Sequence, residues 1–136
     1  MSVDFFIDTN IAVYTLSTPS LKKEIARSLL IKRPQMSTQV IMEMVNVLIR
    51  KFKFTKAEAF ESAMNMVKDR ELRSVTKYTV VKAFEIAKRN QLSHWDSLIV
   101  ASALEADCKT LYSEDMQHGL VIEGNLTIVN PFVSIS

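Results

Sequence analysis

The sequence predicts an α/β sandwich with a mainly parallel central sheet. The first indication is an apolar run, Val3–Ile7, which contains two phenylalanines and reads as a strand buried on both faces. The second is the alternation of short strand-like runs with longer segments of helical periodicity. The chain has 136 residues, which is enough for a sizeable core, so we expect a single domain over residues 1–136.

The composition is that of an ordinary globular domain. Hydrophobic residues make up 48% of the chain and charged residues 24%, which argues against disorder. Cys108 is the one cysteine, so a disulfide framework or a cysteine-based zinc site cannot form within one chain. The N-terminus lacks a basic signal-type region, and the apolar stretch Leu98–Leu104 is far too short to cross a bilayer. We therefore expect a cytoplasmic protein with no membrane partner.

Two helices and a second strand are expected after the first strand. Asn10–Leu16 reads as a short helix. Ser20–Lys32 reads as a longer one, because it begins after one proline and ends before another. Gln35–Ser37 is expected to be a short strand, which would return the chain to the sheet.

The middle of the chain predicts two consecutive helices. Val40–Phe52 is helical by its spacing, with apolar residues at i, i+3, i+4 and i+7 in Ile41, Met44, Val45 and Leu48. Thr55 and Glu58 form a capping box that opens the next helix. The periodicity predicts that this helix buries a stripe made of Phe60, Ala63, Met64 and Val67.

The last part of the chain alternates strands with helices. Arg73–Thr76, Lys109–Ser113 and Leu126–Val129 read as strands. Val80–Arg89 reads as a helix, and the side predicted to be buried carries Val80, Phe84 and Ala87. Asp96–Ala106 is apolar almost all round, which predicts a central, buried helix. The final residue, Ser136, is expected to be dispensable for folding.

Four carboxylates stand within or directly beside core-like sequence. Asp8 follows the first strand, Glu43 interrupts an apolar helix, Asp96 opens the buried helix, and Asp115 follows the strand at 109–113. Charged residues are rarely buried unless they are paired or bound to a metal. Because the carboxyl ends of parallel strands meet at one edge of a sheet, we expect the four acids to form one pocket. Carboxylate oxygens are the ligands that Mg²⁺ prefers, so this pocket predicts a divalent metal site.

Each of these acids also has a simpler explanation. Asp8 can be the N-cap of the helix that follows, and Asp96 fits the acidic position of a capping box. Glu43 can lie on the exposed face of its helix. Asp115 stands in a turn-like segment where acids are common, and Glu114 competes for its role. One pocket accounts for all four acids together, which favours the metal-site interpretation.

Small polar residues accompany the acids. Thr9, Asn10, Ser97 and Ser113 are candidates for orienting the carboxylates, although local caps and turns explain each of them singly. Crowded carboxylates repel one another without a cation, so one or more of their pKa values should be raised. A cation held there would polarise a phosphodiester and lower the pKa of a bound water, which is the chemistry of metal-dependent hydrolysis.

The charge distribution is compatible with a polyanionic substrate. Setting the four pocket acids aside leaves 11 acidic residues against 17 basic ones. The basic residues gather in two clusters, Lys22, Lys23, Arg27, Lys32 and Arg33, and then Arg50, Lys51, Lys53 and Lys56. A basic surface around an acidic centre suits a polyanion held over a metal. Solvated helix faces explain any single cluster as well.

The motifs that carry the acids resemble those of PIN domains, and specifically of VapC-type toxins of toxin–antitoxin pairs. They are F-I-D-T-N-I-A-V-Y around Asp8, S-T-Q-V-I-M-E-M-V-N-V-L around Glu43, S-H-W-D-S-L-I-V-A-S-A around Asp96 and L-Y-S-E-D-M-Q-H-G around Asp115. The resemblance extends from Val3 to about Pro131. Haloacid-dehalogenase-like phosphotransferases also begin with a strand that ends in aspartate, but they require a second aspartate where this chain has Asn10.

The resemblance implies a three-layer α/β/α sandwich and a metal-dependent endoribonuclease. By its pattern, Asp8, Glu43, Asp96 and Asp115 bind Mg²⁺ or Mn²⁺, and Asn10 and Ser113 match supporting polar positions. A metal-activated water would cleave RNA, often transfer RNA, and leave 5′-phosphate and 3′-hydroxyl ends. The resemblance also implies a homodimer that is neutralised by a cognate antitoxin protein.

Three other functions stay open at this point. One is a PIN-domain nuclease of RNA processing or decay without toxin behaviour. Another is a catalytically silent module whose acids bind a metal or a basic partner. The third is a nuclease that acts on DNA.

Overall fold

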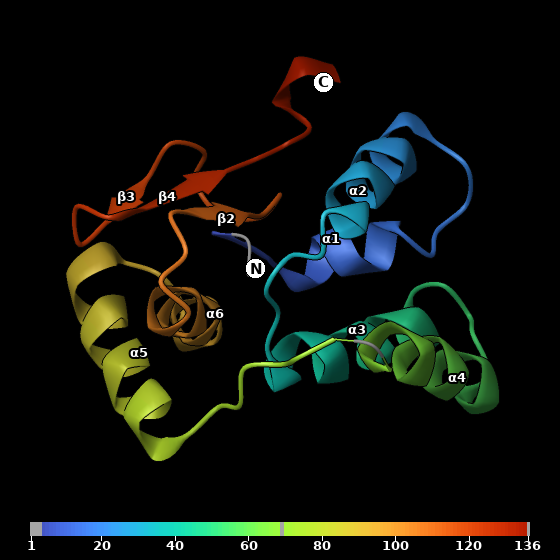
Figure 1. Cartoon of the computed structure of the whole chain (residues 1–136), viewed down its shortest axis with the longest axis horizontal. Coiled ribbons are helices and arrows are strands. Elements are labelled where there is room, and N and C mark those ends of the chain that lie inside the picture. Colours follow the sequence, from blue (N-terminus) through green and yellow to red (C-terminus); the bar gives the residue numbers. More distant parts are fainter. Residues whose placement is uncertain (1–3, 69, 136) are drawn as a thin grey trace.

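A four-stranded sheet lies at the centre of the computed structural model, which describes residues 4–68 and 70–135 (Figure 1). In sheet order the strands are β1 (Phe5–Ile7), β2 (Thr110–Tyr112), β4 (Leu126–Val129) and β3 (Val121–Ile122). β1, β2 and β4 run parallel, whereas β3 is antiparallel to β4. The predicted α/β fold with a mainly parallel sheet is therefore confirmed.

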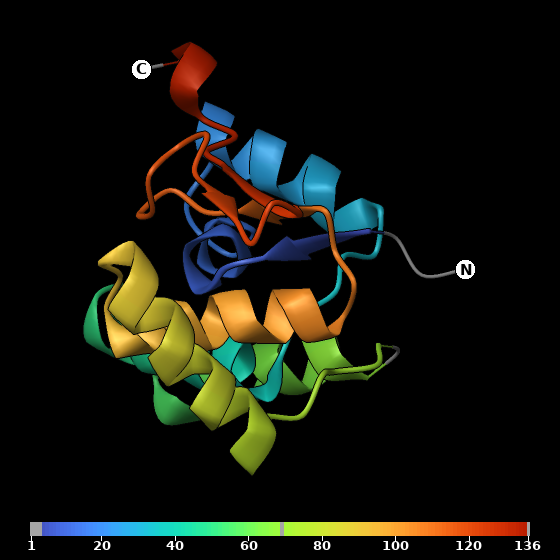
Figure 2. The ribbon, with the colours of Figure 1, turned by 90° about the vertical axis from the view of Figure 1, so that its left-hand side faces the viewer.

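Helices cover both faces of this sheet. Figure 2 shows α2 (Leu21–Ile31) on one side and α5 (Lys77–Asn90) and α6 (His94–Glu105) on the other, which makes three layers. The remaining helices are α1 (Thr9–Tyr14), α3 (Thr38–Arg50) and α4 (Lys56–Val67), and a short 3₁₀ turn, Val133–Ile135, comes after β4. Within the described residues, no helix combines the length and the apolar character that crossing a membrane requires.

The centre of the core is built from the strands and from α6. Phe6, Ile7, Leu111 and Ile128 are completely buried, as expected for strands that are covered on both faces. α6 packs against α5 and lies along one face of the sheet (Figure 2), and it buries Ser97 and the continuous run 99–103, which includes the small residues Ala101, Ser102 and Ala103. This burial confirms the prediction of a central apolar helix.

Two predicted strands are reduced to single parallel bridges, and one strand was not predicted. The bridges pair Phe6 with Gln35 and Ser37 with Arg73. Extension stops at Ser37 because this residue turns to cap α3, and its side chain accepts a hydrogen bond from the Val40 N–H. β3 has two residues, which is too short for any alternation to be recognised.

The predicted buried faces of α4 and α5 are only partly correct: Ala63 is buried as predicted, and Val67, Val80 and Ala87 are half-buried, but the largest predicted side chains are exposed. On α4, Phe60 and Met64 are 49% and 62% exposed, and the core-facing residues are Ala59, Ala63 and Met66. On α5, Phe84 is 54% exposed, and the helix buries Thr79, Ala83 and Ile86. In both helices the face that packs on a neighbouring helix is rich in small residues, which allow close approach, whereas the pattern favoured the largest side chains.

Two predictions concern residues outside the described parts of the chain. The first predicted strand begins at Val3, and the structure describes this strand from Phe5 onward. Ser136, predicted to be dispensable, also lies outside the described residues.

Candidate active site

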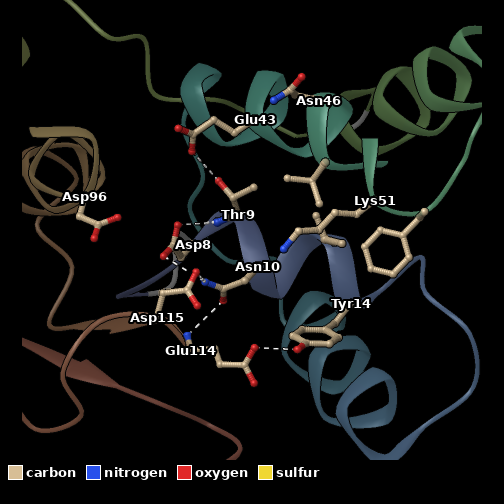
Figure 3. A pocket seen from close by; sticks show the side chains of 13 residues that line it. Asp8, Thr9, Asn10, Tyr14, Glu43, Asn46, Lys51, Asp96, Glu114 and Asp115 are labelled. Atoms are coloured by element: carbon tan, nitrogen blue, oxygen red, sulfur yellow. Dashed lines mark hydrogen bonds between the residues drawn. The ribbon is translucent and has the colours of Figure 1, made fainter. Parts of the chain in front are cut away.

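A cleft of about 380 Å³ opens beside the carboxyl ends of β1 and β2 (Figure 3). It is lined by residues of α1, α3, α6 and the loop that follows β2, namely Asp8, Thr9, Asn10, Val13, Tyr14, Glu43, Asn46, Val47, Lys51, Phe52, Asp96, Glu114 and Asp115. The four acids predicted from the sequence thus lie around one cleft, although they come from four separate segments. Their chemical roles stay predictions.

Asp8 occupies the deepest position of the four acids. It follows β1, and its backbone N–H donates to the Tyr112 carbonyl of β2 at 3.0 Å, so the sheet fixes its place. Its side chain is 5% exposed. Oδ1 accepts a hydrogen bond from the Thr9 N–H at 2.7 Å, and Oδ2 accepts one from Ser113 Oγ at 2.7 Å. Asp8 is therefore the N-cap of α1 and a cleft residue at once, so its capping role does not exclude a role in the cleft.

Burial and mutual repulsion raise the pKa values of two of the four acids, Asp8 and Asp96. Burial raises the pKa of Asp8 from 3.8 to about 6, and the charges of Asp96 and Asp115 add to this effect. Hydrogen bonds from Ser113 and Thr9 act in the opposite direction. The pKa of Asp96 is also raised, first by burial and then by the charges of Asp115 and Glu43. The expected mutual repulsion is thus present, and a bound cation would relieve it.

Glu43 points into the cleft from α3. Its Oε1 accepts a hydrogen bond from Thr9 Oγ1 at 2.8 Å, and its Oε2 accepts one from Gln39 Nε2 at 3.2 Å. Gln39 Nε2 also donates to the Trp95 carbonyl at 3.2 Å, so the Gln39 side chain links α3 to α6. Gln39 was not predicted as a site residue, although it stands one helical turn before Glu43 and the spacing was available as a signal.

Asp96 approaches the cleft from the first turn of α6. Its backbone N–H donates to Ser93 Oγ at 3.0 Å, so Ser93 is the N-cap. Among the described hydrogen bonds there is none from the Ser93 N–H back to the Asp96 carboxylate, so the capping box is incomplete. The half-buried carboxylate lies on the cleft wall opposite Asp8 (Figure 3). This geometry favours a role in the cleft over the capping explanation.

Glu114 and Asp115 point to different surroundings. Glu114 accepts a hydrogen bond from Tyr14 OH at 2.6 Å and pairs with Lys22. Burial acts to raise the pKa of Glu114, but the hydrogen bonds from Lys22 and Tyr14 outweigh it and lower the pKa. Asp115, by contrast, is free of any described cation, and its Oδ2 accepts a hydrogen bond from Asn10 Nδ2 at 3.2 Å. The geometry therefore favours Asp115 over Glu114 as the fourth acid of the cluster.

Asn10 and Ser113 hold the acids in place. Asn10 Nδ2 lies 3.3 Å from Asp8 Oδ2 and 3.2 Å from Asp115 Oδ2, so its amide bridges two carboxylates. The hydroxyl of Ser113 donates to Asp8 and accepts from the N–H groups of Asp115 and Met116. Ser97, the other polar candidate, is buried in α6 and does not line the cleft.

The donor set fits a hard divalent cation, although the described arrangement is not a finished metal site. Four carboxylates face one cleft, and carboxylate oxygen is the ligand type that Mg²⁺ prefers. Within residues 4–68 and 70–135, no three such side chains stand close enough together to form a ready metal-binding group. Direct coordination of one cation by three or more of these acids therefore requires side-chain movement. Glu43, Asp96 and Asp115 are partly or fully exposed, so they have room to move.

The fold and the acidic cleft together define the class of protein. A family model described as the PIN domain matches residues 5–119, which is most of the chain. The chain therefore belongs to the PIN domain family. A search of curated proteins gives no match.

Solved structures with the same fold include several toxins. VapC20 of Mycobacterium tuberculosis, described as a sarcin–ricin loop cleaving toxin, is 19% identical, with a TM-score of 0.67 over 82% of this chain and 89% of that chain. A toxin–antitoxin complex from Klebsiella pneumoniae is 18% identical, with a TM-score of 0.67 over 93% and 96%. VapBC2 from Rickettsia felis, bound to a DNA fragment from its promoter, is 18% identical, with a TM-score of 0.65 over 91% and 96%. At these identities the likeness establishes a shared fold.

Proposed function

We propose that this protein is a divalent-metal-dependent endoribonuclease and the toxin of a VapBC-type toxin–antitoxin pair. The observation that carries the proposal is the convergence of Asp8, Glu43, Asp96 and Asp115 on one cleft of a PIN domain. Support for an RNA substrate comes from VapC20, which shares the fold and is described as cleaving the sarcin–ricin loop. The substrate is an RNA, with transfer RNA as one candidate.

The residues of the cleft would have two roles: the acids would bind the cation, and the polar residues beside them would orient the acids. Asp8, Glu43, Asp96 and Asp115 would hold Mg²⁺ or Mn²⁺ through their carboxylate oxygens. When bound, the cation supplies a Lewis acid for the phosphodiester and makes a water more acidic. Ser113 and Thr9 fix the orientation of Asp8, and Thr9 and Gln39 fix that of Glu43.

A cognate antitoxin and a second copy of the chain are the proposed protein partners. The Klebsiella and Rickettsia structures are described as toxin–antitoxin assemblies, which supports an antitoxin partner. Large apolar side chains also remain exposed on α4 and α5, namely Phe60, Met64, Tyr78, Val81 and Phe84. Exposed apolar groups of this size are typical of surfaces that a protein partner covers. An RNA substrate and an antitoxin partner both imply a cytoplasmic location.

The decisive test is cleavage of purified total RNA, and of DNA in parallel, in Mg²⁺ or Mn²⁺. The controls are EDTA and Asp96→Asn, in a preparation shown to be folded and free of antitoxin. We expect discrete RNA fragments that vanish in both controls. Absence of cleavage in either metal would favour a catalytically silent binding module. Growth arrest on expression, relieved by the product of an adjacent small gene, would distinguish a toxin from a nuclease of RNA processing.

The two neighbouring acids after β2 should differ sharply in their effect on cleavage. Asp115→Asn should lower the rate by about a hundredfold or more, because it removes a proposed metal ligand. Glu114→Gln should keep most of the activity, because Glu114 is bound to Tyr14 and Lys22 rather than to the acidic cluster. Initial rates of the two variants under saturating metal give the comparison. The reverse order of effects would assign the fourth position to Glu114.

A further inference from the structure

One end of the acidic cleft carries a basic residue, Lys51. The last turn of α3 and the residues after it contribute Asn46, Val47, Lys51 and Phe52 to the lining. Figure 3 shows the Lys51 side chain extending along the cleft, with its ammonium group directed toward the part where Asn10 lies. Among the described residues, the Lys51 ammonium makes no ion pair, although carboxylates line the same cleft. It is therefore available to a negatively charged ligand.

The positive charge continues outward from Lys51. Arg50, Lys53 and Lys56 are all exposed, and residues 44–57 contain no acidic side chain. Phe52, which lies between Lys51 and Lys53 in the sequence, is 39% exposed. Lys53 has a φ of 62°, so the chain makes a tight left-handed turn there and leaves α3 for α4. Basic side chains with an exposed aromatic ring between them are the combination that binds single-stranded nucleic acid.

We infer that this segment, Arg50–Lys56, binds an RNA strand that continues beyond the cleft, with Lys51 on a phosphate next to the scissile one. The inference rests on the proposed nuclease function and names how its substrate is held. The four acids repel a polyanion. A cation bound by them would neutralise the scissile phosphate only. The flanking phosphates therefore need positive charge from the protein. Lys51 is the cleft residue that supplies it, and the Phe52 ring offers a face for a base.

Steady-state cleavage kinetics test the role of Lys51. We expect Lys51→Gln to raise KM about tenfold with kcat nearly unchanged, which corresponds to the loss of about 1.4 kcal/mol of binding. Lys51→Arg should restore most of the affinity, because the charge is kept. Lys109→Gln is the matched control, because Lys109 is exposed and precedes β2 at the opposite edge of the sheet. A KM for Lys51→Gln equal to that of Lys109→Gln, or a loss confined to kcat, would overturn the inference.

Binding without cleavage separates this inference from the proposed function. In an Asp8→Asn background, anisotropy of a labelled single-stranded RNA is measured over a range of salt concentrations. Removing Lys51 should make the slope of log affinity against log salt shallower by about 0.7, the value for one phosphate contact on a single strand. Lys51-dependent binding in this background, together with no cleavage by the wild type in either metal, would support the inference and refute the nuclease. Cleavage that is indifferent to Lys51, with an unchanged salt slope, would overturn the inference and leave the nuclease standing.

Discussion

Asp8→Asn should abolish RNA cleavage and leave the fold intact. Asp8 is the most deeply buried of the four acids, and its two carboxylate oxygens accept hydrogen bonds from the first N–H of α1 and from Ser113 after β2. The amide has the same shape but a weaker affinity for Mg²⁺. We expect the rate to fall by at least about a thousandfold, since metal-dependent stabilisation of the transition state amounts to several kcal/mol.

The control for this variant should remove a carboxylate that lies outside the cleft. Asp107→Asn is suitable, because Asp107 is exposed just before β2 and its φ of 57° is a conformation that asparagine tolerates. Cleavage rates and thermal unfolding are measured for the wild type and both variants. Full activity of Asp8→Asn would defeat the four-acid account. Loss of activity together with loss of the unfolding transition would point to a structural role of Asp8 instead.

The features that the sequence predicted well are those set by local patterns. The apolar run before Asp8 predicts the buried strand, and the lack of a polar face predicts that α6 is buried. Parallel strands then bring their carboxyl ends to one edge, so Asp8 and Asp115 meet although they are far apart in the chain. The order of the predicted parallel strands is therefore enough to predict that the cleft forms at their carboxyl ends.

The features that could not be predicted depend on side-chain partners distant in sequence. Glu114 differs from Asp115 because it is bound by Tyr14 and Lys22. These two residues precede Glu114 by 100 and 92 positions in the sequence. The amide of Asn10 likewise reaches Asp115 across 105 residues. The buried faces of α4 and α5 also follow their neighbours in space rather than the size of their side chains. Such contacts are decided by packing, about which a single sequence carries little information.

The metal-free protein should lose stability as the pH rises from about 4 to about 6. The pKa of Asp8 is 3.8 in the unfolded chain and about 6 in the fold, so between these values the folded state binds more protons. Its contribution is therefore fully present below the lower value and is lost as the pH passes the upper one. For a group this deeply buried, a shift of that size corresponds to about 3 kcal/mol. The raised pKa of Asp96 acts in the same direction.

Adding Mg²⁺ should reverse this loss, because the cation binds the charged carboxylates that the fold otherwise destabilises. The measurement is the free energy of unfolding in urea at about pH 5 and about pH 7.5, with EDTA and with Mg²⁺. In EDTA the wild type should be less stable at the higher pH, and Asp8→Asn should be much less dependent on pH. Mg²⁺ should stabilise the wild type mainly at the higher pH and Asp8→Asn hardly at all. Equal stabilisation of both proteins would place the cation away from Asp8. The expected results would instead show that the charged acidic cleft destabilises the fold in the absence of a cation, and that Mg²⁺ bound at Asp8 offsets this effect.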